Sequence, residues 1–142
     1  RFGKSEFDQT YEVGGDGRVK IPATLGVVAG SNPSDPIKIS LTAILNKKPQ
    51  VLREIVTTIP STRIATLRVP FQWLCYGERS ITGDSVETAV NTCGEGKTCV
   101  AGSCQTQEVD SSLLPDFKEV EIFGGGTSNG DGKCFDRRSD RA

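Results

Sequence analysis

The clearest hydrophobic pattern in the chain is a strict alternation over residues 67–75. Apolar side chains occupy every second position there, at Leu67, Val69, Phe71, Trp73 and Cys75. The positions between them are mostly polar, as in a strand with one face in the core and the other in water. We therefore predict a half-buried strand at 67–75 whose apolar side chains, the single Trp included, belong to the core.

A second alternation covers residues 37–45, and it places Ile39 and Leu41 on the same predicted core face. Residues 46–49 (Asn-Lys-Lys-Pro) are typical of a turn. The following stretch, 51–59, is rich in β-branched residues and is predicted to be a strand. A helix is the weaker alternative, because Val, Ile and Thr lose rotamer freedom against the preceding helical turn.

Shorter β-rich pieces complete the predicted sheet structure, at residues 10–13, 18–21, 24–29 and 117–123. With 16 Gly and 7 Pro the chain suits many short strands joined by tight turns. Roughly seven strands at spacings of about ten residues are typical of a β-sandwich. We predict one all-β domain over residues 1–142, an immunoglobulin-like β-sandwich of about seven strands with a disulfide-bearing, Gly-rich loop.

The two ends of the chain are predicted to lie outside this core. Residues 1–9 are polar with isolated aromatic side chains and form an arm that is either disordered or paired with the sheet edge of a neighbour. The apolar side chains that would carry such an assembly contact are Phe2, Phe7, Tyr11 and Val13. The charged tail, 136–142, is predicted to be frayed.

Five cysteines indicate the compartment and the covalent framework: Cys75, Cys93, Cys99, Cys104 and Cys134. Three of them crowd into a Gly-rich stretch within residues 76–112, predicted to be a cysteine-rich insertion or loop. This pattern favours disulfides and therefore an extracellular, cell-surface or periplasmic location. We expect Cys75 to be tied into this knot and two of the five to be joined locally, although spacing does not give the connectivity. Cys134 is free, bonded to a second chain, or bonded to a cysteine beyond the end.

Charge and composition argue against some classes of binding partner and some classes of site. The 17 basic and 18 acidic side chains leave a net charge of −1, so no strong field attracts nucleic acid. No apolar run approaches the roughly 18 residues of a membrane span. The chain contains no His, the usual general base near neutral pH and the commonest metal ligand. We accordingly predict no enzyme activity, no metal and no cofactor.

The sequence contains no complete metal-binding or nucleotide-binding motif. The cysteine spacing does not match a zinc site, and the loop before Lys133 lacks the Gly and the Ser or Thr of a phosphate-binding loop. Neither Gly turn near Asp16 or Asp131 supplies the oxygen set that Ca²⁺ requires. Trp73 with Arg68 suggests a carbohydrate platform, but the two lie on opposite faces by parity, which favours Trp73 in the core.

Three segments together resemble secreted or lipoprotein surface proteins of unknown function from myxobacteria and related bacteria. They are residues 51–75 with the Trp-Leu-Cys ending, residues 93–104 with the Cys-Val-Ala-Gly-Ser-Cys ending, and residues 114–136 with the Gly-Lys-Cys-Phe-Asp ending. The resemblance implies an exported β domain with disulfides and no assigned reaction. In that group another cysteine often follows the Cys-Phe-Asp segment. A lipid-bearing N-terminal cysteine, if present, would lie upstream of Arg1.

These observations lead to one main functional prediction and one alternative. The first is a non-enzymatic structural or adhesion module of the cell surface that acts by protein–protein contact or self-association, with a filament built by strand addition as one form. The alternative is a carbohydrate- or small-ligand-binding module of a secreted protein.

Overall fold

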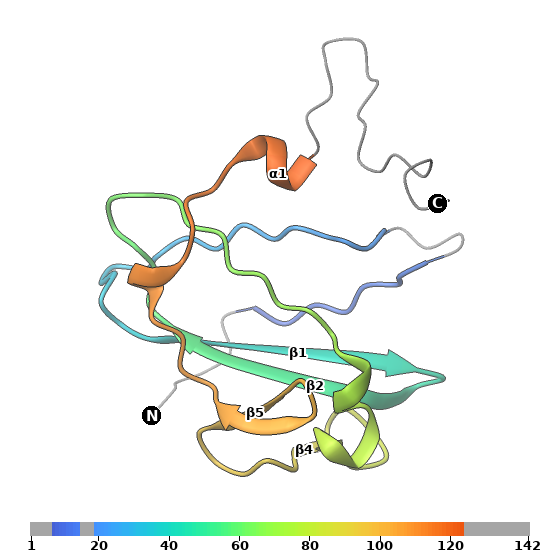
Figure 1. The fold of residues 1–142 in the computed structure, drawn as a ribbon. Coiled ribbons are helices and arrows are strands. Elements are labelled where there is room, and N and C mark those ends of the chain that lie inside the picture. Colours follow the sequence, from blue (N-terminus) through green and yellow to red (C-terminus); the bar gives the residue numbers. More distant parts are fainter. Residues whose placement is uncertain (1–6, 15–18, 124–142) are drawn as a thin grey trace, which may run out of the picture. The chain divides into compact units, whose positions relative to one another are not determined.

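The computed structural model describes residues 7–14 and 19–123. The chain divides into two compact units. The described part of the first comprises residues 28–115, and that of the second comprises residues 7–14, 19–27 and 116–123. The described residues are mostly strands in small antiparallel sheets with little helix (Figure 1).

The first unit is built on a long β-hairpin of β1 (Ile37–Leu45) and β2 (Lys48–Thr57). The antiparallel register pairs Ile39 with Ile55, and one irregularity falls between Ala43 and Ile44. The strand predicted at 37–45 from alternation is confirmed. The strand predicted at 51–59 from β-branching is confirmed with shifted bounds, since β2 begins at Lys48, inside the predicted turn, and ends at Thr57. The two-residue turn has positive φ at Asn46 (51°) and Lys47 (66°). Positive φ at both turn residues gives the turn a twist that matches the twist of the two strands.

Four short strands form two further antiparallel pairs. β3 (Ile81–Thr82) pairs with β4 (Val90–Asn91), and β5 (Lys97–Val100) pairs with β6 (Ser103–Thr106). Figure 1 shows β4 and β5 on the β2 side of the hairpin. The described strands thus form three two-stranded sheets, and the seven-strand immunoglobulin-like sandwich is not confirmed.

Two 3₁₀ turns lie between β2 and β3, namely η1 (Trp73–Cys75) and η2 (Gly77–Arg79), and a third, η3 (Ser111–Leu113), follows β6. The core of the unit lies between β2 and the cysteine-bearing segments. Its buried members include Val51, Cys75 and Cys99, with Ala43 and Cys93 packed against them. Ile55 and Ile81 are buried as well, at 1% and 3% exposed.

The predicted strand at 67–75 is wrong. Residues 67–72 belong to no strand, and Trp73 to Cys75 form η1 instead. Pro70 has no N–H to give to a sheet ladder, and alternation by itself supplies no partner strand. Trp73 is 79% exposed and Phe71 is 42% exposed, so their assignment to the core is also wrong. The other predicted core residues, Leu67, Val69, Ile39 and Leu41, are half-buried.

The second unit contains little regular structure among its described residues. Val13 and Val19 form an isolated bridge in place of a strand, and the peptide bond before Pro22 is cis. The predicted strand at 117–123 is wrong, since its second half is the short helix α1 (Glu119–Phe123). A Lys118–Glu121 ion pair of 3.2 Å spans its first turn, an interaction that favours helix over strand locally.

Candidate functional site

Two disulfides cross-link the segment from η1 to β6. Cys75 bonds to Cys99, and Cys93 bonds to Cys104. The first ties the Trp73 turn to β5, and the second closes the loop between β4 and β6. The predictions that Cys75 joins the knot and that two cysteines bond locally are confirmed. Cys134 lies outside the described residues.

Side-chain hydroxyls attach this disulfide-bonded region to the hairpin. The backbone N–H of Leu52 donates to Ser80 Oγ at 3.1 Å, and that of Glu54 donates to Thr98 Oγ1 at 3.0 Å. Ser80 Oγ in turn donates to the carbonyl of Cys75 at 2.5 Å. Ser80 and Thr98 are completely or almost completely buried. Leaving a buried amide without an acceptor would cost free energy. The two hydroxyls therefore hold the disulfide-bonded segment, residues 73–106 (the knot), against the edge of β2.

Arg53 makes a third link. Its Nη1 donates to the carbonyl of Cys99 at 2.8 Å. Burial lowers the pKa of the Arg53 guanidinium from its ordinary value, because a charged group loses hydration there. The guanidinium still remains charged, since arginine does not lose its proton in proteins. Arg53 therefore acts here as a hydrogen-bond donor between β2 and β5.

An exposed patch that contains two aromatic rings lies in the disulfide-bonded segment, and we call it the Trp73 surface. It lines a small hollow of about 290 Å³ and consists of four side chains, Trp73, Leu74, Tyr76 and Arg79. The rings of Trp73 and Tyr76 stack with centroids 4.9 Å apart and planes inclined by 27°. Trp73, Leu74 and Tyr76 are 79%, 53% and 40% exposed. Their apolar area faces solvent although the adjacent Cys75 is buried.

The backbone that carries Trp73 and Leu74 is attached to the β5–β6 hairpin through the residues on either side, Gln72 and Cys75. Gln72 Oε1 accepts the N–H of Ala101 at 2.7 Å, and Cys75 carries the disulfide to Cys99. The β5–β6 turn approaches so closely that a Cβ on Gly102 would lie 3.2 Å from Leu74 Cβ. Gly102 also has a φ of +83°, which favours glycine. The surface is consequently pre-formed, and binding on it would order few backbone groups.

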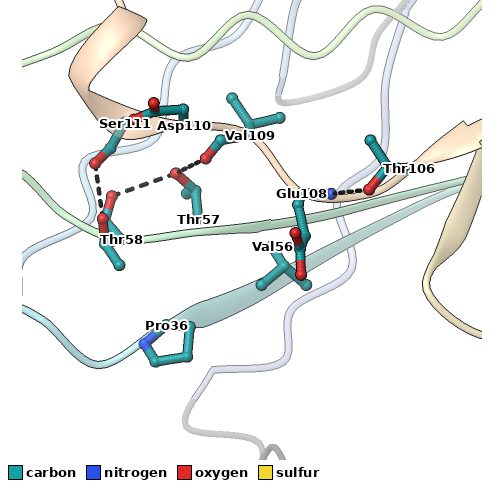
Figure 2. A pocket seen from close by; sticks show the side chains of 9 residues that line it. All are labelled: Pro36, Val56, Thr57, Thr58, Thr106, Glu108, Val109, Asp110 and Ser111. Atoms are coloured by element: carbon teal, nitrogen blue, oxygen red, sulfur yellow. Dashed lines mark hydrogen bonds between the residues drawn. The ribbon is translucent and has the colours of Figure 1, made fainter.

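A second concavity lies at the end of β2, which we call the Thr57 groove (Figure 2). It has a volume of about 470 Å³ and is open to solvent. Its lining combines hydroxyls, two carboxylates and a few apolar side chains: Pro36, Val56, Thr57, Thr58, Thr106, Glu108, Val109, Asp110 and Ser111.

The polar groups of the Thr57 groove bond mainly to one another and to the backbone. Thr57 Oγ1 donates to the carbonyl of Val109 at 2.8 Å, and the hydroxyls of Thr58 and Ser111 lie 2.7 Å apart, as Figure 2 shows. The Asp110 carboxylate accepts the N–H of Ser112 at 2.9 Å as an N-cap bond. Hydrogen bonding from the Ser112 side chain, and secondly from its backbone N–H, lowers the pKa of Asp110. These bonds explain the groove as a structural junction, with no hydroxyl paired to a general base.

The other predicted site residues are distributed as follows. Phe7, Tyr11 and Val13 of the predicted assembly arm are 61%, 50% and 50% exposed, while Phe2 lies outside the described residues. In the described part of the chain, no three His, Cys, Asp or Glu side chains gather in a way that could hold a metal ion. Within the same residues, no helix has the length and apolar character to cross a membrane.

Tyr76, Leu74 and Arg79 were not predicted as site residues. The signal for them was the sequence Trp73-Leu74-Cys75-Tyr76, in which apolar residues are consecutive and cannot all face one side of a strand. No protein-family model, curated protein or solved structure matches this chain.

Proposed function

We propose that this chain is a non-enzymatic, exported module that acts by protein contact through the Trp73 surface. The observation that carries the proposal is the exposed, stacked Trp73–Tyr76 pair beside Arg79. Trp, Tyr and Arg are the residue types that contribute most to the free energy of binding at protein interfaces. Exported status is supported by the two disulfides, which persist in oxidising compartments such as the periplasm or the cell exterior.

The rigidity of the backbone that carries the Trp73 surface supports the same role. A surface that is already ordered loses little conformational entropy on binding, so a modest apolar area gives useful affinity. The disulfide at Cys75 and the Gln72–Ala101 hydrogen bond supply that order directly beneath the rings. A pre-ordered apolar surface of this kind is typical of a structural or adhesion module, which acts by contact and requires no catalytic group.

The test is binding of the labelled protein to the surface of cells that produce it. Trp73→Ala is expected to weaken binding by about 2 kcal/mol, or about 30-fold in Kd, as for a central interface residue. Leu113→Ala is the matched control, because Leu113 is also exposed (81%) but lies outside the Trp73 surface. Equal binding by both variants would contradict the proposal.

The stacked rings also favour a second candidate, carbohydrate binding, because apolar aromatic faces can pack against sugar rings. Treating the cells with protease or with glycosidase before binding separates the two. Protein contact predicts loss after protease only. Carbohydrate contact predicts loss after glycosidase only, together with a saturable change in the fluorescence of Trp73, the only Trp in the chain.

A further inference from the structure

Among the residues that the structure describes, the outer edge of β1 has no backbone partner. On β2, the N–H groups of Leu52, Glu54 and Val56 bond away from β1, to Ser80, Thr98 and the carbonyl of Gln107. The backbone groups of Ile55 and Arg53 therefore face β1, where their partners are Ile39 and Leu41.

By the same alternation, the backbone N–H and C=O groups of Lys38, Ser40 and Thr42 point outward, away from β2. Within residues 7–14 and 19–123, no backbone hydrogen bond reaches these three residues from outside the hairpin. The outer edge of β2 is occupied by the knot, so β1 carries the hairpin's available edge.

The usual protection of such an edge is weak here. A lysine on an edge strand ordinarily projects its charge and discourages pairing. Lys38 Nζ instead lies 2.7 Å from Glu54 Oε1 on the neighbouring strand, which neutralises the charge on the hairpin itself. The strand contains no proline, and its single irregularity comes only after Ala43.

We propose that β1 pairs with β1 of a second copy in antiparallel orientation, centred on Ser40, to give a continuous four-stranded sheet. The regular part of β1 runs over residues 37–43, and Ser40 is its midpoint. A twofold axis there places Ser40 opposite its own equivalent and Lys38 opposite Thr42, so no like charges face each other. On the other face it pairs half-buried Ile39 with Leu41.

This arrangement closes on itself. Each hairpin contributes the one edge that the knot leaves open, so pairing uses both and yields a dimer in place of a filament. The inference deepens the proposed protein-contact function by naming one partner, a second copy. It depends on β1 and not on the Trp73 surface, so either proposal can fail without the other.

Cysteine cross-linking tests the register directly. In a Cys134→Ser background, Ser40→Cys is expected to give a covalent dimer on mild oxidation, since residues opposite each other in a hydrogen-bonded pair lie about 5.5 Å apart between Cα atoms, within disulfide range. Lys38→Cys and Thr42→Cys are the matched controls. Each alone should stay monomeric on a non-reducing gel, and an equal mixture should cross-link to each other.

Other outcomes overturn the proposal. No Ser40→Cys dimer, or a dimer without the Lys38–Thr42 mixed product, would exclude this register. A Ser40→Cys dimer that forms only after deletion of residues 1–9 would mean that the edge is covered by the chain's own arm.

A non-covalent measurement completes the test. Ser40→Lys keeps a favourable charge near Glu54 within one copy, since Ser40 Oγ lies 3.4 Å from Glu54 Oε1. Between copies it sets two lysines opposite each other. It should raise the dimer dissociation constant by about fivefold in sedimentation experiments. Gln105→Lys, on the exposed strand β6, should leave it unchanged, and an equal effect of both variants would contradict the proposed interface.

Discussion

The β1–β2 hairpin and the disulfide-bonded region beside it reach order by different means. The hairpin is two long strands, Ile37–Leu45 and Lys48–Thr57, held by a backbone ladder around a two-residue turn. The neighbouring segment, residues 73–106, has strands of two to four residues, two 3₁₀ turns and both disulfides. One region carries its order in the backbone pattern, and the other carries it in cross-links.

The contrast explains where the binding surface lies. A ladder places side chains in a fixed alternation, so neighbouring residues face opposite sides of the sheet. Cross-links hold irregular backbone instead, and irregular backbone can expose Trp73 and Leu74 next to buried Cys75. The two regions depend on each other through Ser80 and Thr98, whose hydroxyls complete the hydrogen bonding of β2.

The largest expected effect is loss of the Cys75–Cys99 disulfide. Its cysteines are both 2% exposed and 24 residues apart, so Cys75→Ala/Cys99→Ala removes a loop constraint of about 3 kcal/mol and also opens the core. The Cys93–Cys104 disulfide joins a more exposed pair only 11 residues apart, so Cys93→Ala/Cys104→Ala should cost about 2–3 kcal/mol. Chemical denaturation measures both. Equal losses would mean that the first disulfide contributes nothing to packing.

Next comes the buried side chain of the hairpin. Ile55 is 1% exposed, so Ile55→Ala should lower the free energy of unfolding by about 2–5 kcal/mol through lost burial and a residual cavity. Ile44, which is 41% exposed on the partner strand, is the control, and Ile44→Ala should cost less than about 1 kcal/mol. Thermal or urea unfolding distinguishes them. Similar costs at both positions would contradict the assigned core.

The junction between the regions gives a smaller effect. Ser80→Ala leaves the N–H of Leu52 and the carbonyl of Cys75 without their partner and should cost about 1–3 kcal/mol. Its signature is faster amide exchange at Leu52, which stability alone does not report. Ser103→Ala, on exposed β6, should change neither quantity. Unchanged exchange at Leu52 in Ser80→Ala would disprove the junction.

The turn of the hairpin gives the smallest effect, and with the opposite sign. Lys47 has a φ of 66°, a left-handed backbone conformation that is unfavourable for most residues other than glycine, asparagine and aspartate. Lys47→Gly should therefore raise the free energy of unfolding by about 0.5 kcal/mol, since relief of strain exceeds the added entropy of the unfolded chain. Lys48→Gly, inside β2, should lower it. A loss at both positions would show that the turn is not strained.

Whether a predicted strand formed depended on whether a partner strand lay beside it. Residues 37–45 alternate, residues 51–57 are rich in β-branched side chains, and the two segments pair with each other, so the local sequence was sufficient to form a sheet. Residues 67–75 also alternate, but Pro70 interrupts the ladder, and within residues 7–14 and 19–123 no segment pairs with them along their length. Trp73 was placed in the core on the assumption that the alternation meant a sheet, and this assumption failed.

The sequence by itself determined the hairpin, its turn, the presence of disulfides and the absence of His-based chemistry, because these depend on neighbouring residues or on residue type alone. Only the tertiary structure decided which cysteines pair, which hydroxyls complete the edge of β2 and which aromatic rings face solvent. Those outcomes depend on contacts between residues more than ten positions apart, such as Cys75 with Cys99 and Leu52 with Ser80, and local periodicity does not encode them.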